Sequence, residues 1–266
     1  MEINIDQTKW WQRIWASFIF FTRLPFWRIH QPSKECYKTV VEHWPLTGWL
    51  TGGLMAAIVY FGSMVMPVYM ALLFAIIGRI LLTGALHEDG LCDFIDGFGG
   101  GGKDRKRILD IMKDSHIGTY GVLGIVLYLA LLFATLFTIA LSPHPSLLLP
   151  LNIFAGDAYS KMLSAQIIMF LPYARSEETA KNHTVYRKMS IPAAISLFVQ
   201  GMLPMIPLLY IYTNLRWDLL IFVPCIVMYF LYYQMMHRLR GYTGDCCGAL
   251  CLIIELSFYL TVALQL

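Results

Sequence analysis

The chain has 266 residues, of which 58% are hydrophobic and only 14% are charged. Soluble globular domains carry about a quarter charged residues, so this composition excludes an ordinary soluble enzyme and predicts an integral membrane protein. The formal net charge of +3 is too small to indicate binding to nucleic acid, and membrane lipid is the expected surrounding. We interpret residues 1–266 as a single membrane domain.

The first apolar stretch, residues 10–26, is interrupted by Arg13 and Arg23. Tryptophans such as Trp10 and Trp11 favour the boundary between lipid and water, so we expect an N-terminal interfacial helix there. Seven further stretches are each near the roughly 20 residues that a helix needs to cross the hydrocarbon core. They are residues 46–65, 67–86, 118–141, 147–171, 190–213, 217–236 and 247–265. The expected fold is all-α, a polytopic membrane bundle of about seven transmembrane helices.

Positive charge is concentrated in alternate connections between these stretches. Residues 1–45 and the segments 87–117, 172–189 and 237–246 hold seventeen of the 20 Lys and Arg residues, and the opposite connections hold only Arg216. Basic connections stay on the cytoplasmic side of a membrane, so the N-terminus and all three charged segments are predicted to face the cytoplasm. An odd number of spans then places the C-terminus on the outer side.

The most highly charged part of the chain has the sequence HEDGLCDFIDGFGGGGKDRKRILDIMKDSHI, which we predict to be a cytoplasmic active-site loop. Asp89, Asp93 and Asp96 stand at i, i+4 and i+7, which places them on one face of a helix. Carboxylates this close repel one another unless cations lie between them, and Mg²⁺ prefers carboxylate oxygens. Asp110 and Asp114 repeat the i, i+4 spacing, so all five are predicted to bind Mg²⁺, with the second pair supporting a second ion.

Small and basic residues that could hold a diphosphate follow these aspartates directly. They are Gly99, Gly100, Gly101, Gly102, Lys103, Arg105, Lys106 and Arg107. Glycine lets the backbone approach an anion closely, and the cations neutralise phosphate. Two other interpretations stay open: the basic residues could anchor the segment on the cytoplasmic side, and its charges could serve solubility alone.

Asp245 lies in GYTGDCCGA, at the start of the last predicted span and between Gly244 and Gly248. It is interpreted as a metal ligand or a general base, with a helix N-cap as the alternative. His87 is interpreted as an acid–base group or as a hydrogen-bonding neighbour. The predicted catalytic residues are therefore Asp245, Asp89 and His87, and which of them is the general base is left open.

Charged residues also occur inside the predicted spans. Asp157 and Lys161 stand at i, i+4 and are expected to neutralise each other. Arg79 and Glu255 lie roughly 12 and 15 Å from the charged end at helical rise, so we predict an ion pair between them. These residues keep a cation transporter open as a non-enzyme alternative, although a transporter would place its main carboxylates midway across the membrane.

Several motifs in this chain resemble the cobalamin synthase family, the adenosylcobinamide-GDP ribazoletransferases. They are FFTRLPF at 20–26, HEDGLCDFIDGFGGG at 87–101, RILDIMKDSHIGTYG at 107–121, and GYTGDCCGA at 241–249 with Glu255 beyond it. The matches keep their order and span most of the chain. Departures such as Cys92, where a small residue is usual, remove no carboxylate.

The resemblance implies an enzyme that joins adenosylcobinamide-GDP to α-ribazole or α-ribazole 5′-phosphate. GMP leaves, and adenosylcobalamin or its 5′-phosphate is formed. The resemblance also implies Mg²⁺ as cofactor and the bacterial inner membrane as location. Because a ribose hydroxyl attacks a diphosphate, metal and basic groups should dominate catalysis.

Two other enzyme classes also place aspartates near a membrane and use Mg²⁺ on a diphosphate. A CDP-alcohol phosphotransferase would carry D-x-x-D-G-x-x-A-R, and this chain lacks that A-R. A prenyltransferase would carry a second aspartate motif, and segment 172–189 holds no aspartate. The number of metal ions, the preferred form of ribazole, the seating of the corrinoid and homo-oligomer formation are left open.

Overall fold

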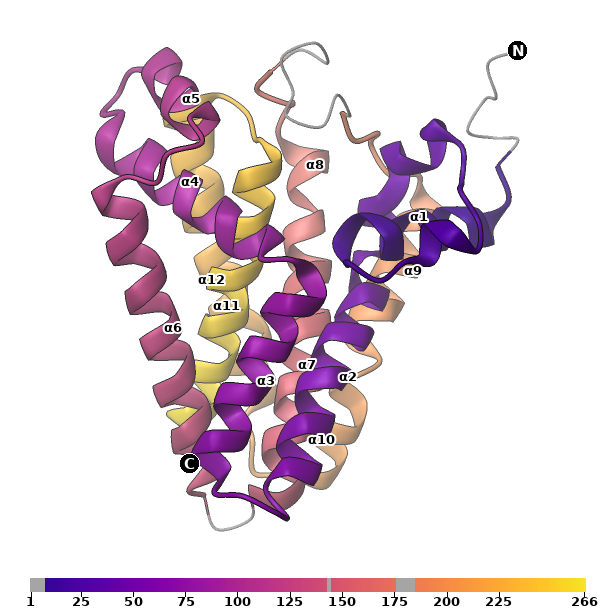
Figure 1. Cartoon of the computed structure of the whole chain (residues 1–266), viewed down its shortest axis with the longest axis vertical. Helices are drawn as coiled ribbons and strands as arrows, with labels where there is room; N and C mark the ends of the chain where they lie inside the picture. Colours follow the sequence, from indigo (N-terminus) through magenta and orange to yellow (C-terminus); the bar gives the residue numbers. More distant parts are fainter. Residues whose placement is uncertain (1–7, 143–144, 176–184) are drawn as a thin grey trace.

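The computed structural model of the protein describes residues 8–142, 145–175 and 185–266. Long helices run alongside one another and form a bundle (Figure 1). The elements are α1 (Trp10–Phe21), η2 (Phe26–Arg28), η3 (Lys34–His43), α2 (Trp44–Gly62), α3 (Val68–Thr83), α4 (Leu86–Gly100), α5 (Arg105–Lys113), α6 (Thr119–Ala140), α7 (Pro145–Ala165), α8 (Ile167–Phe170), α9 (Ile191–Met202), α10 (Met205–Ile211), α11 (Trp217–Gln234), η5 (Met235–Leu239) and α12 (Gly244–Ala263). The predicted all-α membrane bundle is confirmed across these residues.

Among the described residues, five helical segments are long and apolar enough to cross a membrane, or six if the bent pair α3–α4 counts as one span. The five are Lys34–Gly62, Thr119–Ala140, Ile191–Ile211, Trp217–Leu239 and Gly244–Ala263. Helix α7 covers most of the predicted span 147–171, but buried polar side chains such as Asp157 and Lys161 make it less apolar. The number seven therefore stays a prediction.

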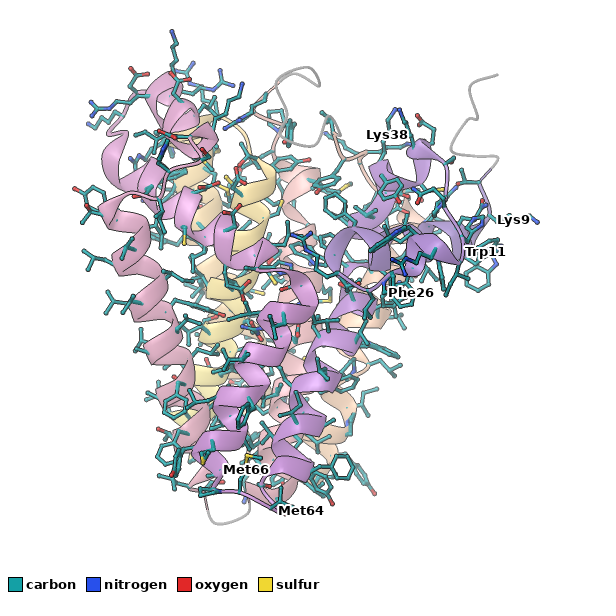
Figure 2. The ribbon with its side chains drawn as sticks, viewed as in Figure 1. Lys9, Trp11, Phe26, Lys38, Met64 and Met66 are labelled. Carbon is teal, nitrogen blue, oxygen red and sulfur yellow. The ribbon has the colours of Figure 1, made fainter. Side chains whose placement is uncertain are left out.

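Charged side chains gather at one end of the bundle. Figure 2 shows Lys9 and Lys38 at the end that carries η3, α4 and α5, whereas Met64 and Met66 lie at the opposite end. The C-terminus also lies at that opposite end (Figure 1). This arrangement agrees with the prediction that the basic segments lie on one side. Lys181, which belongs to segment 172–189, lies outside the described residues.

Helix α1 lies across the direction of the long helices at the charged end (Figure 1). It has 12 residues, which is too few to cross a bilayer. Ala16 and Ser17 are buried against the rest of the fold, and the Ser17 hydroxyl donates to the carbonyl of Val40 in η3. The Trp10 side chain is 72% exposed, and the interfacial position of α1 stays a prediction.

The chain turns by 88° between α3 and α4. Gly84 and Ala85 both adopt the left-handed conformation at this corner, with φ of 66° and 59°, which is uncommon for alanine. A single span was predicted to run to residue 86, with a loop after it. Instead, most of segment 87–117 is helical. Helix α4 begins at the corner and runs in a different direction from α3, and α5 follows α4 after a short turn.

Helix α12 is the most enclosed of the five apolar segments. Its most apolar stretch is 78% buried, compared with 28–39% in the other four. It contacts α4, α6, α7 and α11. The start of α12 therefore lies where residues from several distant parts of the sequence meet.

Candidate active site

Two glycines bring the first turns of α4 and α12 into backbone contact. A Cβ atom on Gly90 would lie 3.0 Å from the carbonyl oxygen of Asp245 and 3.1 Å from its Cα atom. A Cβ atom on Gly248 would lie 3.2 Å from the carbonyl oxygen of His87. The motifs HEDG and GDCCG therefore fold onto each other, and Asp89 and Asp245 come from adjoining helix turns.

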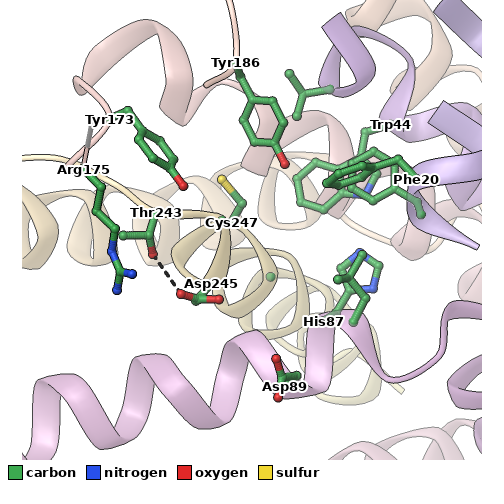
Figure 3. A pocket seen from close by; sticks show the side chains of 15 residues that line it. Phe20, Trp44, His87, Asp89, Tyr173, Arg175, Tyr186, Thr243, Asp245 and Cys247 are labelled. Carbon is green, nitrogen blue, oxygen red and sulfur yellow. Dashed lines mark hydrogen bonds between the residues drawn. The ribbon is translucent and has the colours of Figure 1, made fainter. Parts of the chain in front are cut away.

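A cavity of about 150 Å³ lies beside this contact and is lined by His87, Asp89 and Asp245 (Figure 3). The three predicted catalytic residues are thus brought together. Other lining residues come from α1, η3, α2 and the segments that precede α9 and α12. The lining includes Phe20, Phe21, Trp44, Leu86, Tyr173, Arg175, Tyr186 and Thr243.

Asp245 is held at the start of α12 by its neighbours. Thr243 is the N-cap residue, because its side chain accepts the backbone N–H of Cys246 at 3.3 Å. The alternative that Asp245 caps the helix is therefore wrong. The Thr243 hydroxyl donates to Asp245 Oδ2 at 3.4 Å, and a carboxylate in the first turn is stabilised by the helix dipole.

Arg175 supplies positive charge to the cavity. Its Nη2 donates to the carbonyl of Leu109 in α5 at 2.9 Å. Its Nε and Nη1 are buried and have no hydrogen-bond partner among the described residues. Because a buried N–H without an acceptor costs free energy, these donors suit an anionic ligand.

Two tyrosines add neutral donors. Burial raises the pKa of Tyr173 and of Tyr186 above that of a free phenol, so both stay protonated at neutral pH. The segment of Tyr173 is fixed beside α12, because Ala174 N donates to the carbonyl of Tyr242 at 2.8 Å and Tyr242 N donates to that of Pro172 at 3.0 Å. The cavity therefore combines carboxylates, a guanidinium and phenols.

His87 lines the cavity beside two aromatic residues, Trp44 and Phe21. Its ring stacks on Trp44 with 5.7 Å between the ring centroids, and Phe21 stacks on Trp44 at 5.0 Å. The side chain is only 4% exposed, and its Nε2 has no hydrogen-bond partner in the part of the chain that the structure describes. His87 therefore has a hydrogen-bonding atom available for a ligand, and both interpretations of its role stay predictions.

Comparison with known proteins decides the family. The family model for cobalamin-5-phosphate synthase matches residues 13–263. The chain belongs to the cobalamin-5-phosphate synthase family. The resemblance seen in the motifs is thereby confirmed.

Similar proteins are named adenosylcobinamide-GDP ribazoletransferase. One from Leptospira interrogans is 33% identical over 261 residues, covering 96% of each chain. One from Vibrio vulnificus is 33% identical over 271 residues, covering 96% of this chain and 98% of the relative. One from Shewanella amazonensis is 34% identical over 246 residues, covering 92% of each chain. No solved structure matches this member of the cobalamin-5-phosphate synthase family.

The other predicted metal ligands on α4 lie outside the cavity. Asp93 is partly buried, and Asp96 is 7% exposed. The two carboxylate oxygens of Asp96 accept the backbone N–H groups of Gly118 at 2.6 Å and Gly121 at 2.8 Å. These bonds satisfy donors at the N-terminus of α6, so the structure gives Asp96 a structural role that the sequence did not predict.

Asp110 in α5 and Asp114 directly after that helix are both exposed. Asp114 ends that helix, and the backbone N–H of His116 donates to it at 3.0 Å, which lowers the pKa of the Asp114 carboxyl. Within residues 8–142, 145–175 and 185–266, no group of three or more His, Cys, Asp or Glu side chains is arranged to hold a metal ion. The predicted five-aspartate cluster is not assembled there, whereas Asp89 and Asp245 do share a cavity.

The glycine run lies at the far end of α4 and packs against other helices. A Cβ atom on Gly99 would collide with the ring of Tyr120 in α6, and one on Gly101 would collide with Ile108 in α5. Gly100 faces Ile111 at ordinary contact distance. Close packing thus accounts for Gly99 and Gly101 without a ligand, and their predicted contact with a diphosphate stays a prediction.

The basic cluster after these glycines has mixed roles. Lys103 lines a second, open pocket with Gly99 and Arg238. The Arg105 guanidinium donates to the carbonyls of Leu239 at 2.8 Å and Ala174 at 2.9 Å, so it ties α5 to two other segments. Arg107 is exposed. Lys103, Arg105 and Arg107 do not line the cavity of Asp89.

The predicted ion pair between Arg79 and Glu255 is confirmed. Arg79 Nη1 donates to both carboxylate oxygens of Glu255, at 2.7 and 2.8 Å, and Nη2 donates to the Tyr128 hydroxyl at 3.1 Å. The Tyr259 hydroxyl donates to Glu255 at 2.6 Å. Glu88 lies 4.0 Å from Arg79 Nη2, so this one guanidinium joins α3, α4, α6 and α12.

The predicted pairing of Asp157 with Lys161 is also confirmed, by a hydrogen bond between their side chains. Thr51 of α2 donates a further hydrogen bond to Asp157 at 2.6 Å. The two buried carboxylates of α7 and α12, Asp157 and Glu255, thus have protein partners. This pairing gives no support to the transporter alternative.

No motif in the sequence points to Arg175, Tyr186 or Trp44. Arg175 is one of several basic residues in segment 172–189, and the two aromatic residues follow no motif spacing. The available signal was position, because Tyr173 and Arg175 directly follow a predicted span at the same end as HEDG and GDCCG. Residues at one end of a bundle can share a site although they are far apart in sequence.

Replacing Gly90 with alanine should lower activity. The new methyl group would press on the backbone of Asp245, which cannot turn aside, so α4 and α12 must separate. Overpacking of this kind typically costs about 1–3 kcal/mol, and a displacement of about 1 Å can cost roughly 100-fold in rate. Turnover and thermal unfolding in detergent would be measured beside Gly53→Ala, whose Cβ would make an ordinary 3.8 Å contact with Phe154. Equal activity of the two variants would contradict the close helix contact.

Proposed function

We propose that this protein is an adenosylcobinamide-GDP ribazoletransferase, which joins adenosylcobinamide-GDP to α-ribazole or its 5′-phosphate. The products are GMP and adenosylcobalamin or its 5′-phosphate. The observation that carries the proposal is the shared cavity of Asp89, Asp245 and Arg175 in a chain whose family model spans residues 13–263.

In this reaction a ribose hydroxyl oxygen forms a bond to the phosphorus on the cobinamide side of the diphosphate. The bond from that phosphorus to the oxygen of GMP breaks, and GMP leaves with that oxygen. The hydroxyl proton must pass to a base, and Asp245 is placed for this at the cavity wall, oriented by Thr243. Arg175 balances the negative charge on the phosphoryl oxygens.

Mg²⁺ is the proposed cofactor, and the residues at the cavity fit it. Mg²⁺ is usually held by one or two carboxylates together with substrate phosphates. Asp89 is exposed at the cavity and would hold the ion there together with oxygens of the substrate diphosphate. When bound, the ion would neutralise charge on the diphosphate and on the departing GMP.

We further propose that the protein resides in the bacterial inner membrane and that the cavity opens toward the cytoplasm. The basic segments support this orientation, because such segments stay on the cytoplasmic side. The cavity is built from the same end of the bundle as these segments, since Arg175 and Tyr173 belong to segment 172–189. Water-soluble substrates would then reach it directly.

The activity can be tested with purified protein in detergent, adenosylcobinamide-GDP, α-ribazole and Mg²⁺. We expect release of one GMP for each corrinoid product, and complete loss of turnover when EDTA removes divalent ions. A reaction that requires both substrates but continues in EDTA would contradict the role of Mg²⁺ alone. Absence of GMP release under all conditions would contradict the proposed activity.

A further inference from the structure

The cavity beside Asp89 has a charged half and an aromatic half. Figure 3 shows Arg175 and Asp245 on one side, and Phe20, Trp44 and His87 on the other. The Tyr186 ring also borders the cavity and lies edge-on to Phe20, with 6.3 Å between the ring centroids. The reaction uses the charged half and leaves the aromatic half without an assigned role.

Nearly parallel rings form the base of the aromatic half. The planes of Phe21 and Trp44 differ by 11° and those of Trp44 and His87 by 12°, with centroids 5.0 and 5.7 Å apart. Spacings of about 4.5–7 Å are those at which aromatic rings attract one another. All three side chains are at most 4% exposed, so packing fixes the rings before any ligand arrives. A fixed wall of this kind suits a flat aromatic ligand.

The size of the cavity limits which part of a substrate it can hold. Its volume is about 150 Å³. A cavity of roughly that volume accepts a benzene-sized ring, whereas pockets that enclose a drug-sized molecule measure about 300–1,000 Å³. The cavity is therefore too small to enclose a corrinoid, and the part of a substrate that it suits best is a single planar base.

The chemistry of the wall distinguishes between the two planar bases of the reaction. Guanine carries polar atoms around most of its edge, and burying them without partners would cost free energy. The dimethylbenzimidazole ring of α-ribazole has one free ring nitrogen and an otherwise apolar edge. Phe20, Phe21 and Leu86 offer apolar surface, and Trp44 Nε1 is a buried donor without a partner among the described residues. This surface matches the apolar base better than guanine.

We propose that the aromatic half binds the dimethylbenzimidazole ring of α-ribazole and so directs its ribose toward Asp89 and Asp245. The inference rests on the proposed function and adds a specificity site to it. Phe20 and Tyr186 contact the base, and the parallel rings of Phe21, Trp44 and His87 form the wall behind it. A single cavity thereby holds the apolar base and the hydroxyl that reacts.

The test compares Phe20→Ala, Phe20→Leu and Tyr186→Leu with the control Phe61→Ala, whose ring is 64% exposed near the end of α2. Equilibrium dialysis of the detergent-solubilised full chain measures the affinity for free 5,6-dimethylbenzimidazole without turnover. Steady-state kinetics give KM for each substrate, and thermal unfolding identifies any variant that fails to fold. Loss of a stacking ring should weaken dimethylbenzimidazole binding and raise KM for α-ribazole by roughly tenfold in Phe20→Ala.

KM for adenosylcobinamide-GDP should stay at the value of the unmodified protein in all the variants. A rise in that KM alone would overturn the inference, because the aromatic half would then hold guanine or the corrinoid. Unchanged constants in folded Phe20→Leu and Tyr186→Leu would also overturn it. If the unmodified protein released no GMP, the proposed function would fail separately. Dimethylbenzimidazole binding that Phe20→Ala weakens would then still support the site, and no binding would reject it.

Discussion

Replacing Asp89 or Asp245 with asparagine is expected to lower turnover by about 10²–10⁴-fold while leaving the folded protein intact. Asparagine has the shape of aspartate but carries no charge, so it can neither take up a proton at neutral pH nor hold Mg²⁺ strongly. Both side chains reach the cavity surface rather than the packed core, so the bundle should tolerate the change. GMP release and thermal unfolding in detergent would measure the two effects.

Asp218→Asn is the matched control, because this partly exposed aspartate pairs with Arg216 at the start of α11 and lies outside the cavity. Its activity should equal that of the unmodified protein. The two catalytic variants should also differ in their dependence on Mg²⁺. Asp89→Asn should need more of the ion for its residual turnover, and Asp245→Asn should not. Normal turnover in either variant would remove that residue from the mechanism.

Replacing Arg79 with glutamine is expected to lower the free energy of unfolding by about 3–5 kcal/mol. The guanidinium is 3% exposed and satisfies Glu255, so its loss would leave a buried carboxylate without its cation. Thermal unfolding followed by tryptophan fluorescence would detect the change. Arg216→Gln is the control, because the pair of Arg216 with Asp218 is exposed and should contribute little.

A charge swap tests the same ion pair more sharply. If Arg79 and Glu255 formed an isolated pair, Arg79→Glu combined with Glu255→Arg would restore what either change loses. Glu88 alters this expectation, because its Oε1 lies 4.0 Å from Arg79 Nη2. The swap would place two carboxylates side by side, so we expect only partial recovery until Glu88→Gln is added. Full recovery by the swap alone would show that Glu88 does not interact with position 79.

Much of the fold could be predicted because hydrophobic length and charge are local properties of the sequence. The apolar stretches form helices close to their predicted bounds, and similar distances from the charged end were enough to pair Arg79 with Glu255. The corner between α3 and α4 could not be predicted. It depends on left-handed backbone at Gly84 and Ala85, and alanine gives no sequence signal for that conformation.

The candidate site was predicted in part. The motifs supplied Asp89, His87 and Asp245, and the structure brings them to one cavity. Helical spacing also grouped Asp96 with the metal ligands, although it accepts hydrogen bonds from the backbone of α6. Spacing shows which residues share a helix face, but it does not show what packs against that face. For the same reason Arg175, from a distant segment, was not singled out.

The depth of α12 within the bundle has a consequence for biosynthesis. The helices that surround it, α4, α6, α7 and α11, all precede it in the chain and leave the ribosome earlier. These four helices must therefore stay apart until α12 has been synthesised, or change their packing when α12 inserts between them. A nascent chain that already contains α4 still lacks Asp245, so under the proposed mechanism it cannot turn over substrate until translation has passed α12.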